Sequence, residues 1–124
     1  DVLRAAIESE LARDGQVFFL HNRVDTLPRT VQRVRELVPN ARVGLAHGQM
    51  SEGELETRML EFYSGQTQVL VCTTIIESGL DLPRANTLLV DQAENLGLAQ
   101  LYQIRGRVGR SDRRTFCYLL IGPK

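Results

Sequence analysis

Hydrophobic residues follow two spacings along the chain, one typical of helices and one typical of buried strands. Apolar residues three or four positions apart predict three amphipathic helices, with inward faces at Leu3, Ile7 and Leu11; at Val31, Val34, Leu37 and Val38; and at Leu55, Met59 and Phe62. Short apolar runs predict five strands, at Gln16 to Leu20, Arg42 to Ala46, Gln68 to Cys72, Asn86 to Val90 and Thr115 to Ile121. A fourth helix is predicted around Leu98, Leu101, Tyr102 and Ile104.

Local signals mark where the helices begin and end. Gly15 follows the first helix, and Gly65 follows the third. Pro28 is a favoured first-turn residue for the second helix, and Pro39 ends it. Ser51 followed by Glu54 forms a capping box, which predicts that the third helix begins there.

The alternation of helices and continuous apolar strands predicts a three-layer α/β fold. We expect a mostly parallel sheet of about five or more strands, with helices on both faces. Residues 1–124 are interpreted as one domain. Because the chain begins inside a predicted helix and without Met, we expect this domain to be a part of a longer protein. Ligands of such sheets bind at the carboxyl ends of strands, here residues 21–25, 47–50, 73–81 and 91–97.

Composition excludes several classes of protein. The chain has 124 residues, 43% of them hydrophobic, but no apolar run of the ~18 residues that span a membrane. We therefore expect no membrane partner. Cys72 and Cys117 lack metal-ligand spacing and lie in apolar runs, so we interpret them as buried reduced thiols of a cytoplasmic protein and predict no metal site.

Charge is balanced overall but segregated along the chain. Five arginines lie between Arg105 and Arg114, whereas four glutamates lie between Ser51 and Glu61. Fourteen of the fifteen basic residues are arginine. This bias fits anion recognition, because the planar guanidinium group suits phosphate, but a GC-rich genome would produce the same bias without any function. The one lysine is Lys124, so the nucleotide-binding loop GxxxxGK[ST] is absent, and we interpret Asp91 as a strand-end residue. We expect no nucleotide hydrolysis by this chain alone.

The first candidate site is the run from Gln103 to Arg110. Arg107 and Arg110 are three residues apart, so on a continuing helical turn both guanidinium groups point the same way and fit a polyphosphate. The alternative is a solvated arginine-rich helix end, where cations favour the helix dipole.

The second candidate site is the run from Thr73 to Pro83. Threonine hydroxyls at a strand end, followed by a short helix with free N–H groups, suit a nucleic-acid phosphate. Asp81 is then free to accept hydrogen bonds from ribose hydroxyls. The alternative is a helix cap followed by a turn at Gly79.

Two polar loops form a weaker third candidate. His47 and Gly48 follow the second strand, and Asn22 and Arg23 follow the first. Each pair is suited to a backbone phosphate contact, but a solvated loop explains them equally well.

Together, these segments resemble the second, carboxyl-terminal RecA-like lobe of superfamily 2 helicases and translocases. Residues 17–24 match motif IV, residues 69–83 match motif V and residues 101–110 match motif VI. The runs TTIIESGLDLPRANTLLV and GLAQLYQIRGRVGR are similar to the bacterial double-stranded DNA translocases, a group that includes the transcription-repair coupling factors and the branched-DNA helicase RecG. The run IIESGLD with RANT resembles the coupling factors more.

The sequence departs from the RNA-helicase branch of the superfamily. DEAD-box proteins have His at the position of Gln103, Gln at Glu52 and Arg at Leu55. An RNA helicase lobe is therefore disfavoured.

The resemblance implies roles for individual residues. Arg107 and Arg110 are expected to be arginine fingers that reach ATP on a first lobe, which also holds most of the Mg²⁺ and nucleotide contacts. Gln103 is expected to sense the nucleotide, while Gly79 and Asp81 border its ribose. Two further roles are implied: DNA-backbone binding by Thr73 and Thr74, and coupling of the two sites by Glu77.

The resemblance also implies partners and a location. They are double-stranded DNA, the first RecA-like lobe, and RNA polymerase and excision-repair proteins bound through other domains, in a bacterial cytoplasm at the nucleoid. The alternatives are the corresponding lobe of RecG, a stand-alone nucleotide-binding regulatory module, and a protein-interaction domain built on the acidic helix.

Overall fold

The computed structural model describes residues 2–21, 23–47, 49–73, 85–90 and 116–119. Three helices and five strands lie in these ranges: α1 (Val2–Ala12), β1 (Gln16–Leu20), α2 (Leu27–Leu37), β2 (Val43–Ala46), α3 (Glu52–Tyr63), β3 (Val69–Cys72), β4 (Ala85–Val90) and β5 (Phe116–Leu119). The helix predicted around residues 98–104 lies outside the described residues, as do residues 115, 120 and 121 of the last predicted strand.

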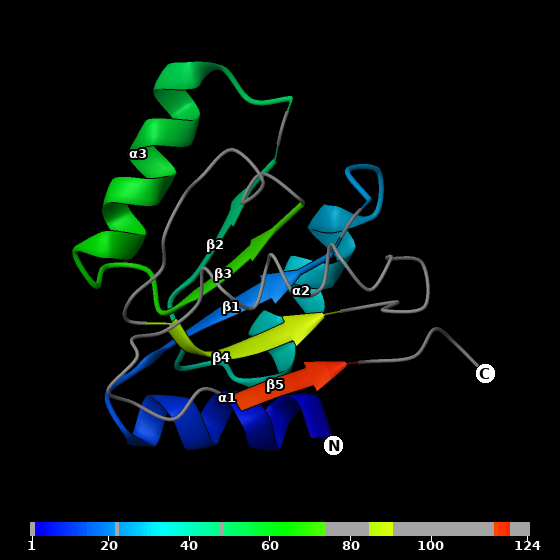
Figure 1. The fold of residues 1–124 in the computed structure, drawn as a ribbon. Helices are drawn as coiled ribbons and strands as arrows, with labels where there is room; N and C mark the ends of the chain where they lie inside the picture. The colour runs from blue at the N-terminus through cyan, green and yellow to red at the C-terminus, as the bar shows by residue number, and fades with distance from the viewer. Residues whose placement is uncertain (1, 22, 48, 74–84, 91–115, 120–124) are drawn as a thin grey trace.

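The strands form one parallel sheet in the order β2-β3-β1-β4-β5 (Figure 1). Strand β1 is central, because it pairs with β3 on one side and with β4 on the other. All carboxyl ends therefore lie at one edge of the sheet, where this architecture places ligands.

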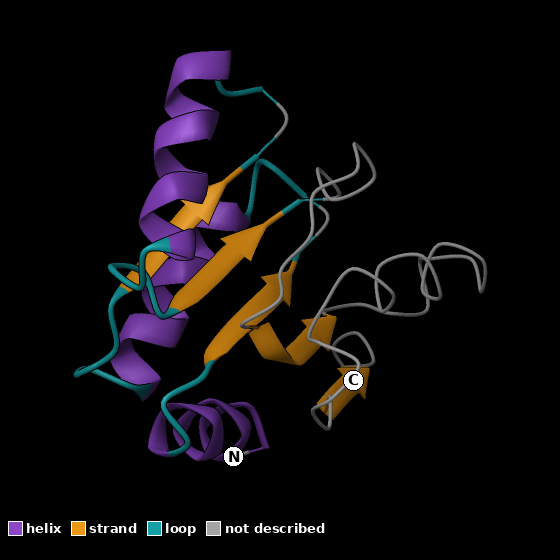
Figure 2. Ribbon diagram, turned by 60° about the vertical axis from the view of Figure 1, so that its left-hand side comes forward, coloured by secondary structure: helices purple, strands orange, loops and turns teal. Residues whose placement is uncertain are grey.

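Alternate side chains of the strands enter two hydrophobic cores on opposite faces. On one face Phe18 and Leu20 of β1 pack with Met59 and Phe62 of α3. On the other face Val17 and Phe19 pack with residues of α1 and α2: Leu3, Ala6, Ile7, Leu27, Val31, Val34 and Val38. Helices cover both sides of the sheet (Figure 2). The predicted three-layer α/β fold with a parallel sheet is confirmed.

The predicted helix boundaries agree closely with the structure. The Ser51 hydroxyl accepts a hydrogen bond from the Glu54 N–H at 3.2 Å and donates to the Glu54 carboxylate at 3.3 Å. The first bond is the N-cap half of the predicted capping box, and the second joins the two side chains. Pro28 lies in the first turn of α2, and Gly65 directly after α3 has a positive φ of 88°, which suits glycine.

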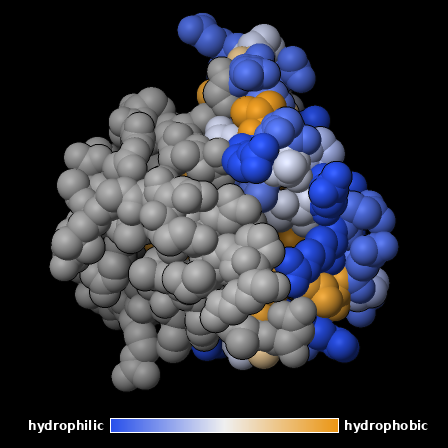
Figure 3. Space-filling view, turned by 90° about the vertical axis from the view of Figure 1, so that its right-hand side faces the viewer, coloured by the Kyte–Doolittle hydropathy of each residue, from blue (hydrophilic) through white to orange (hydrophobic). Residues whose placement is uncertain are grey.

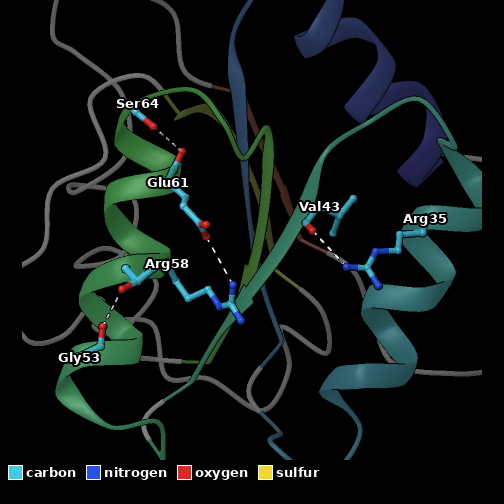
Figure 4. A network of polar contacts seen from close by, with 7 residues as sticks. Arg35, Val43, Gly53, Arg58, Glu61 and Ser64 are labelled. Atoms are coloured by element: carbon cyan, nitrogen blue, oxygen red, sulfur yellow. Dashed lines mark hydrogen bonds and ion pairs between the residues drawn. The ribbon is translucent and has the colours of Figure 1, made fainter.

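Polar contacts fix the edge strand and the outer surface of α3. Arg35 of α2 donates to the Val43 carbonyl of β2 at 3.3 Å, which ties the edge strand to a helix (Figure 4). On α3, Arg58 pairs with Glu61 at 3.5 Å, and the Ser64 hydroxyl donates to the Glu61 carbonyl at 3.2 Å (Figure 4). These contacts are exposed or half-buried and lie away from the carboxyl edge of the sheet.

A buried carboxylate joins α1 to β4. The Glu10 side chain is 0% exposed, and its Oε1 accepts hydrogen bonds from the Thr87 hydroxyl at 2.5 Å and from Arg13 at 2.6 Å. Among the described residues its Oε2 has no hydrogen-bond partner. A Cβ atom on Gly15 would lie 1.8 Å from this oxygen, so the carboxylate fills the space that glycine leaves.

A buried amide joins β1 to the end of α3. The Gln16 Nε2 donates to the carbonyls of Phe62 at 2.5 Å and Thr67 at 2.8 Å. Gln16 is 6% exposed, so both bonds are shielded from water. This amide and the Glu10 carboxylate strengthen the amino-terminal edge of the sheet, opposite the expected ligand edge.

Candidate functional site

The structure describes three of the predicted site residues, namely Arg23, His47 and Thr73. We refer to these three as the strand-end row. The other predicted site residues lie outside the described residues: Asn22, Gly48, Thr74, Glu77, Gly79, Asp81, Gln103, Arg107 and Arg110.

Backbone hydrogen bonds bring the strand-end row together at the carboxyl edge of the sheet. The Thr73 N–H donates to the Ala46 carbonyl at 3.3 Å, directly before His47. The His21 N–H donates to the Cys72 carbonyl at 2.8 Å, directly before Thr73. The row therefore crosses the ends of three adjacent strands, β2, β3 and β1.

The described residues on this side of the molecule present a mainly hydrophilic surface. Figure 3 views the side toward which the strands β1, β4 and β5 point in Figure 1, and the surface that it colours is mostly hydrophilic with small hydrophobic patches. Arg23 is exposed and His47 is half-buried, whereas Thr73 is only 7% exposed. Arg23 and His47 thus offer a ligand more surface than Thr73 does.

The ring of His47 is oriented by its own loop. Its Nδ1 accepts a hydrogen bond from the Gln49 N–H at 3.2 Å, and its carbonyl accepts one from the Met50 N–H at 3.2 Å. Because Nδ1 is an acceptor, the proton of the neutral ring is assigned to Nε2. An Nε2–H group is a hydrogen-bond donor and can bind a phosphate oxygen.

The amino terminus of α3 contributes little to an anion site. Its N-cap Ser51 already binds the Glu54 N–H, and Glu52 and Glu54 place two carboxylates in the first turn. Negative charge there cancels the attraction of the helix dipole for an anion. Among the described residues between β2 and α3, His47 is therefore the better candidate for a contact with an anion.

His21, the first residue after β1, is buried although its side chain is polar. It extends the β1 ladder, is 5% exposed, and its Nε2 hydrogen-bonds the Thr26 hydroxyl at 2.5 Å. Thr26 is the N-cap of α2 but makes no side-chain cap bond. The His21 ring thereby ties the end of β1 to the start of α2.

The same loop holds an exposed ion pair. The Arg23 Nη2 donates to Asp25 Oδ2 at 2.9 Å, with side chains 55% and 67% exposed. The Arg23 hydrogen bond lowers the pKa of the Asp25 carboxyl below its usual 3.8. Asp25 is thus ionised at neutral pH, and sequence reasoning missed it because nothing in the pattern marks which side chain an arginine will pair with.

Other chemistries find little support in the described part of the chain. No group of three or more His, Cys, Asp or Glu able to hold a metal ion lies there. Cys72 is buried and free, and burial raises the pKa of its thiol well above the ordinary value, so it is no nucleophile at neutral pH. None of the described helices is long and apolar enough to cross a membrane. Cys117 is not among the residues whose side chains are described.

Comparison with known proteins places the chain in a family. Residues 1–112 match the model of the helicase conserved C-terminal domain. The chain is 58% identical over 120 residues to the transcription-repair-coupling factor of Myxococcus xanthus, and 50% identical over 119 residues to that of Escherichia coli. These matches cover 97% and 96% of the chain but 10% of each relative, so the chain spans about a tenth of the length of these relatives.

Solved structures agree with this placement. A structure of RecG bound to a three-way DNA junction superimposes with a TM-score of 0.82 and 37% identity, over 98% of this chain and 16% of RecG. The C-terminal part of the Fun30 ATPase domain superimposes with a TM-score of 0.80 at 15% identity, over 100% of this chain and 41% of that one, which shows the fold alone. The predicted resemblance to bacterial DNA translocases is confirmed. The identity is higher to the coupling factors than to RecG, as the sequence motifs indicated.

Proposed function

Because the chain belongs to the helicase conserved C-terminal domain family, we propose that it is the second motor lobe of an ATP-dependent double-stranded DNA translocase acting in transcription-coupled repair. Identity of 50% and 58% to two coupling factors, against 37% to RecG, favours a coupling factor over the branched-DNA helicase. The corresponding lobe of RecG is the second candidate.

The observation that carries this proposal is the strand-end row. Arg23, His47 and Thr73 come from three loops but lie at adjacent strand ends, on the edge where parallel α/β sheets bind ligands. A guanidinium group and an imidazole Nε2–H are donors suited to phosphate oxygens. Asn22, Gly48 and Thr74 adjoin them in the sequence, and we assign them to the same contact with the DNA backbone.

We assign the nucleotide chemistry to the later motifs. Arg107 and Arg110 act as arginine fingers on ATP held with Mg²⁺ by the first lobe, and Gln103 senses its state. Gly79 and Asp81 border the ribose, and Glu77 couples the DNA and ATP sites. The chain lacks the phosphate-binding loop, so the isolated lobe is inactive as an ATP hydrolase.

The mechanism is an alternation between two arrangements of the lobes. ATP draws the lobes together through the arginines, and hydrolysis lets them part. Each lobe grips DNA phosphates with different affinity in the two states, which moves the protein along the duplex. RNA polymerase and excision-repair proteins bind through other domains, in the bacterial cytoplasm at the nucleoid.

Duplex binding by the 124-residue chain tests the DNA grip. We expect Arg23→Gln to weaken binding to a short fluorescent duplex roughly threefold to tenfold, and to make the slope of log K against log salt shallower by about one, because one phosphate contact is lost. Fluorescence anisotropy across a salt series measures both quantities. His47→Ala is expected to weaken binding as well, through the loss of a hydrogen-bond donor, with little change in the slope.

The matched control is Arg4→Gln on α1. Arg4 is also exposed and paired with an acid, Glu8 at 3.4 Å, but it does not belong to the strand-end row. Its loss should leave the slope nearly unchanged. Equal changes in duplex affinity and salt slope at Arg4 and Arg23 would contradict the proposed contact between the strand-end row and DNA. Tight ATP binding by this chain alone would favour a nucleotide-binding regulatory module instead.

A further inference from the structure

One residue of the strand-end row, Arg23, forms an ion pair with Asp25 of the same loop. Arg23 offers the most exposed cationic group of the row, yet its Nη2 already donates to Asp25 Oδ2 at 2.9 Å. We propose that Asp25 competes with DNA phosphates for Arg23 and thereby limits how tightly this loop grips the duplex. This inference rests on the proposed function, since it concerns the same contact with DNA.

Hydrogen bonds within the loop position the two residues of the pair. The Arg23 N–H donates to the His21 carbonyl at 2.9 Å, and the Leu27 N–H donates to the Val24 carbonyl at 3.3 Å, so both halves of the loop are turned. The buried His21 ring and the Thr26 hydroxyl close its base at 2.5 Å. Arg23 and Asp25 therefore lie between backbone hydrogen bonds on either side, in a short segment between β1 and α2.

The ion pair is weak enough that a DNA phosphate can replace Asp25 as the partner of Arg23. Both side chains are more than half exposed, and such ion pairs contribute little to stability because water and salt screen them. A phosphate of a polyanion binds a guanidinium group through two parallel hydrogen bonds and carries neighbouring charges. DNA can therefore displace Asp25, whereas a single small anion gains little by doing so.

The consequence for a motor is an easier release. A lobe that moves along DNA must give up each phosphate contact, and Asp25 offers Arg23 a partner at that moment. The carboxylate also repels the phosphate that leaves. Asp25 therefore lowers the affinity of Arg23 for a DNA phosphate without removing the contact itself.

A double-mutant cycle with a short fluorescent duplex tests the inference on the 124-residue chain. We expect Asp25→Asn to tighten binding about threefold to tenfold at low salt, because Arg23 loses its competitor. In the Arg23→Gln background the same change should tighten binding no more than the control does. The control is Glu8→Gln, which removes an acid from the exposed Arg4–Glu8 pair on α1 with the same change in net charge.

The outcomes separate this inference from the proposed function. If Asp25→Asn tightens binding equally with and without Arg23, or does not exceed Glu8→Gln, Asp25 does not act through Arg23 and the inference is wrong. If the wild-type chain does not bind duplex, or Arg23→Gln leaves binding unchanged, the DNA grip itself fails. Thermal unfolding of each variant, expected to match wild type because the pair is exposed, excludes a folding defect.

Discussion

Replacing Arg107 or Arg110 with alanine in the full-length protein should lower DNA-stimulated ATP turnover by roughly a thousandfold or more. Nucleotide affinity should change only a few-fold. An arginine finger neutralises charge that develops on the transferring phosphoryl group in the transition state, so its loss affects kcat far more than binding. The two arginines lie three residues apart in a run that resembles motif VI.

The control for this prediction is Arg4→Ala in the same protein. Arg4 is an exposed arginine of α1 whose described partner is Glu8, and its loss should leave turnover within twofold of wild type. Turnover is measured at saturating duplex, and affinity with a fluorescent ATP analogue. Unchanged turnover in Arg107→Ala and Arg110→Ala would show that these residues form a solvated helix end and remove the finger assignment.

The second large effect is expected at Gly15, far from the ligand edge. Gly15→Ala should lower the free energy of unfolding by roughly 2–4 kcal/mol. The new Cβ would lie 1.8 Å from Glu10 Oε2, and the carboxylate is fully buried. Glu10 cannot swing away without breaking its hydrogen bonds to Thr87 and Arg13.

Gly53→Ala on α3 is the matched control, and its sign should be opposite. A Cβ at Gly53 meets nothing within 4 Å, and alanine favours a helix over glycine by up to about 1 kcal/mol. Urea unfolding followed by circular dichroism measures both variants. If Gly15→Ala proves as stable as wild type, the buried Glu10 carboxylate does not hold α1 against β4 as described.

The elements of the fold were predictable because their signals are local. The capping box at Ser51, the proline in the first turn of α2 and the apolar runs of the strands each depend on a few neighbouring residues. The strand order β2-β3-β1-β4-β5 was not predictable in this way, since pairing joins residues as far apart as Val17 and Thr87.

The polar interior shows why other features escaped sequence reasoning. Glu10 lies on the apolar face of α1, three residues after Ile7, but its partner Thr87 is 77 residues away. Gln16 opens an apolar strand and binds carbonyls 46 and 51 residues away. A polar residue among apolar neighbours signals burial, but only the fold supplies its partner.

The candidate site was predicted in outline and not in detail. Parallel strands place their carboxyl ends together, which is why Arg23, His47 and Thr73 were expected at one edge. The low exposure of Thr73, the tautomer of His47 and the pairing of Arg23 with Asp25 depend on loop geometry that no periodicity encodes.

The most direct test of a duplex-translocating motor is displacement of a third DNA strand by the full-length protein. A labelled strand bound as a triplex at one end of a duplex is released when a protein moves along the duplex. We expect ATP-dependent release by wild type, slower release by Arg23→Gln, and none by Arg107→Ala. DNA-stimulated ATP hydrolysis that leaves the third strand in place would contradict the account.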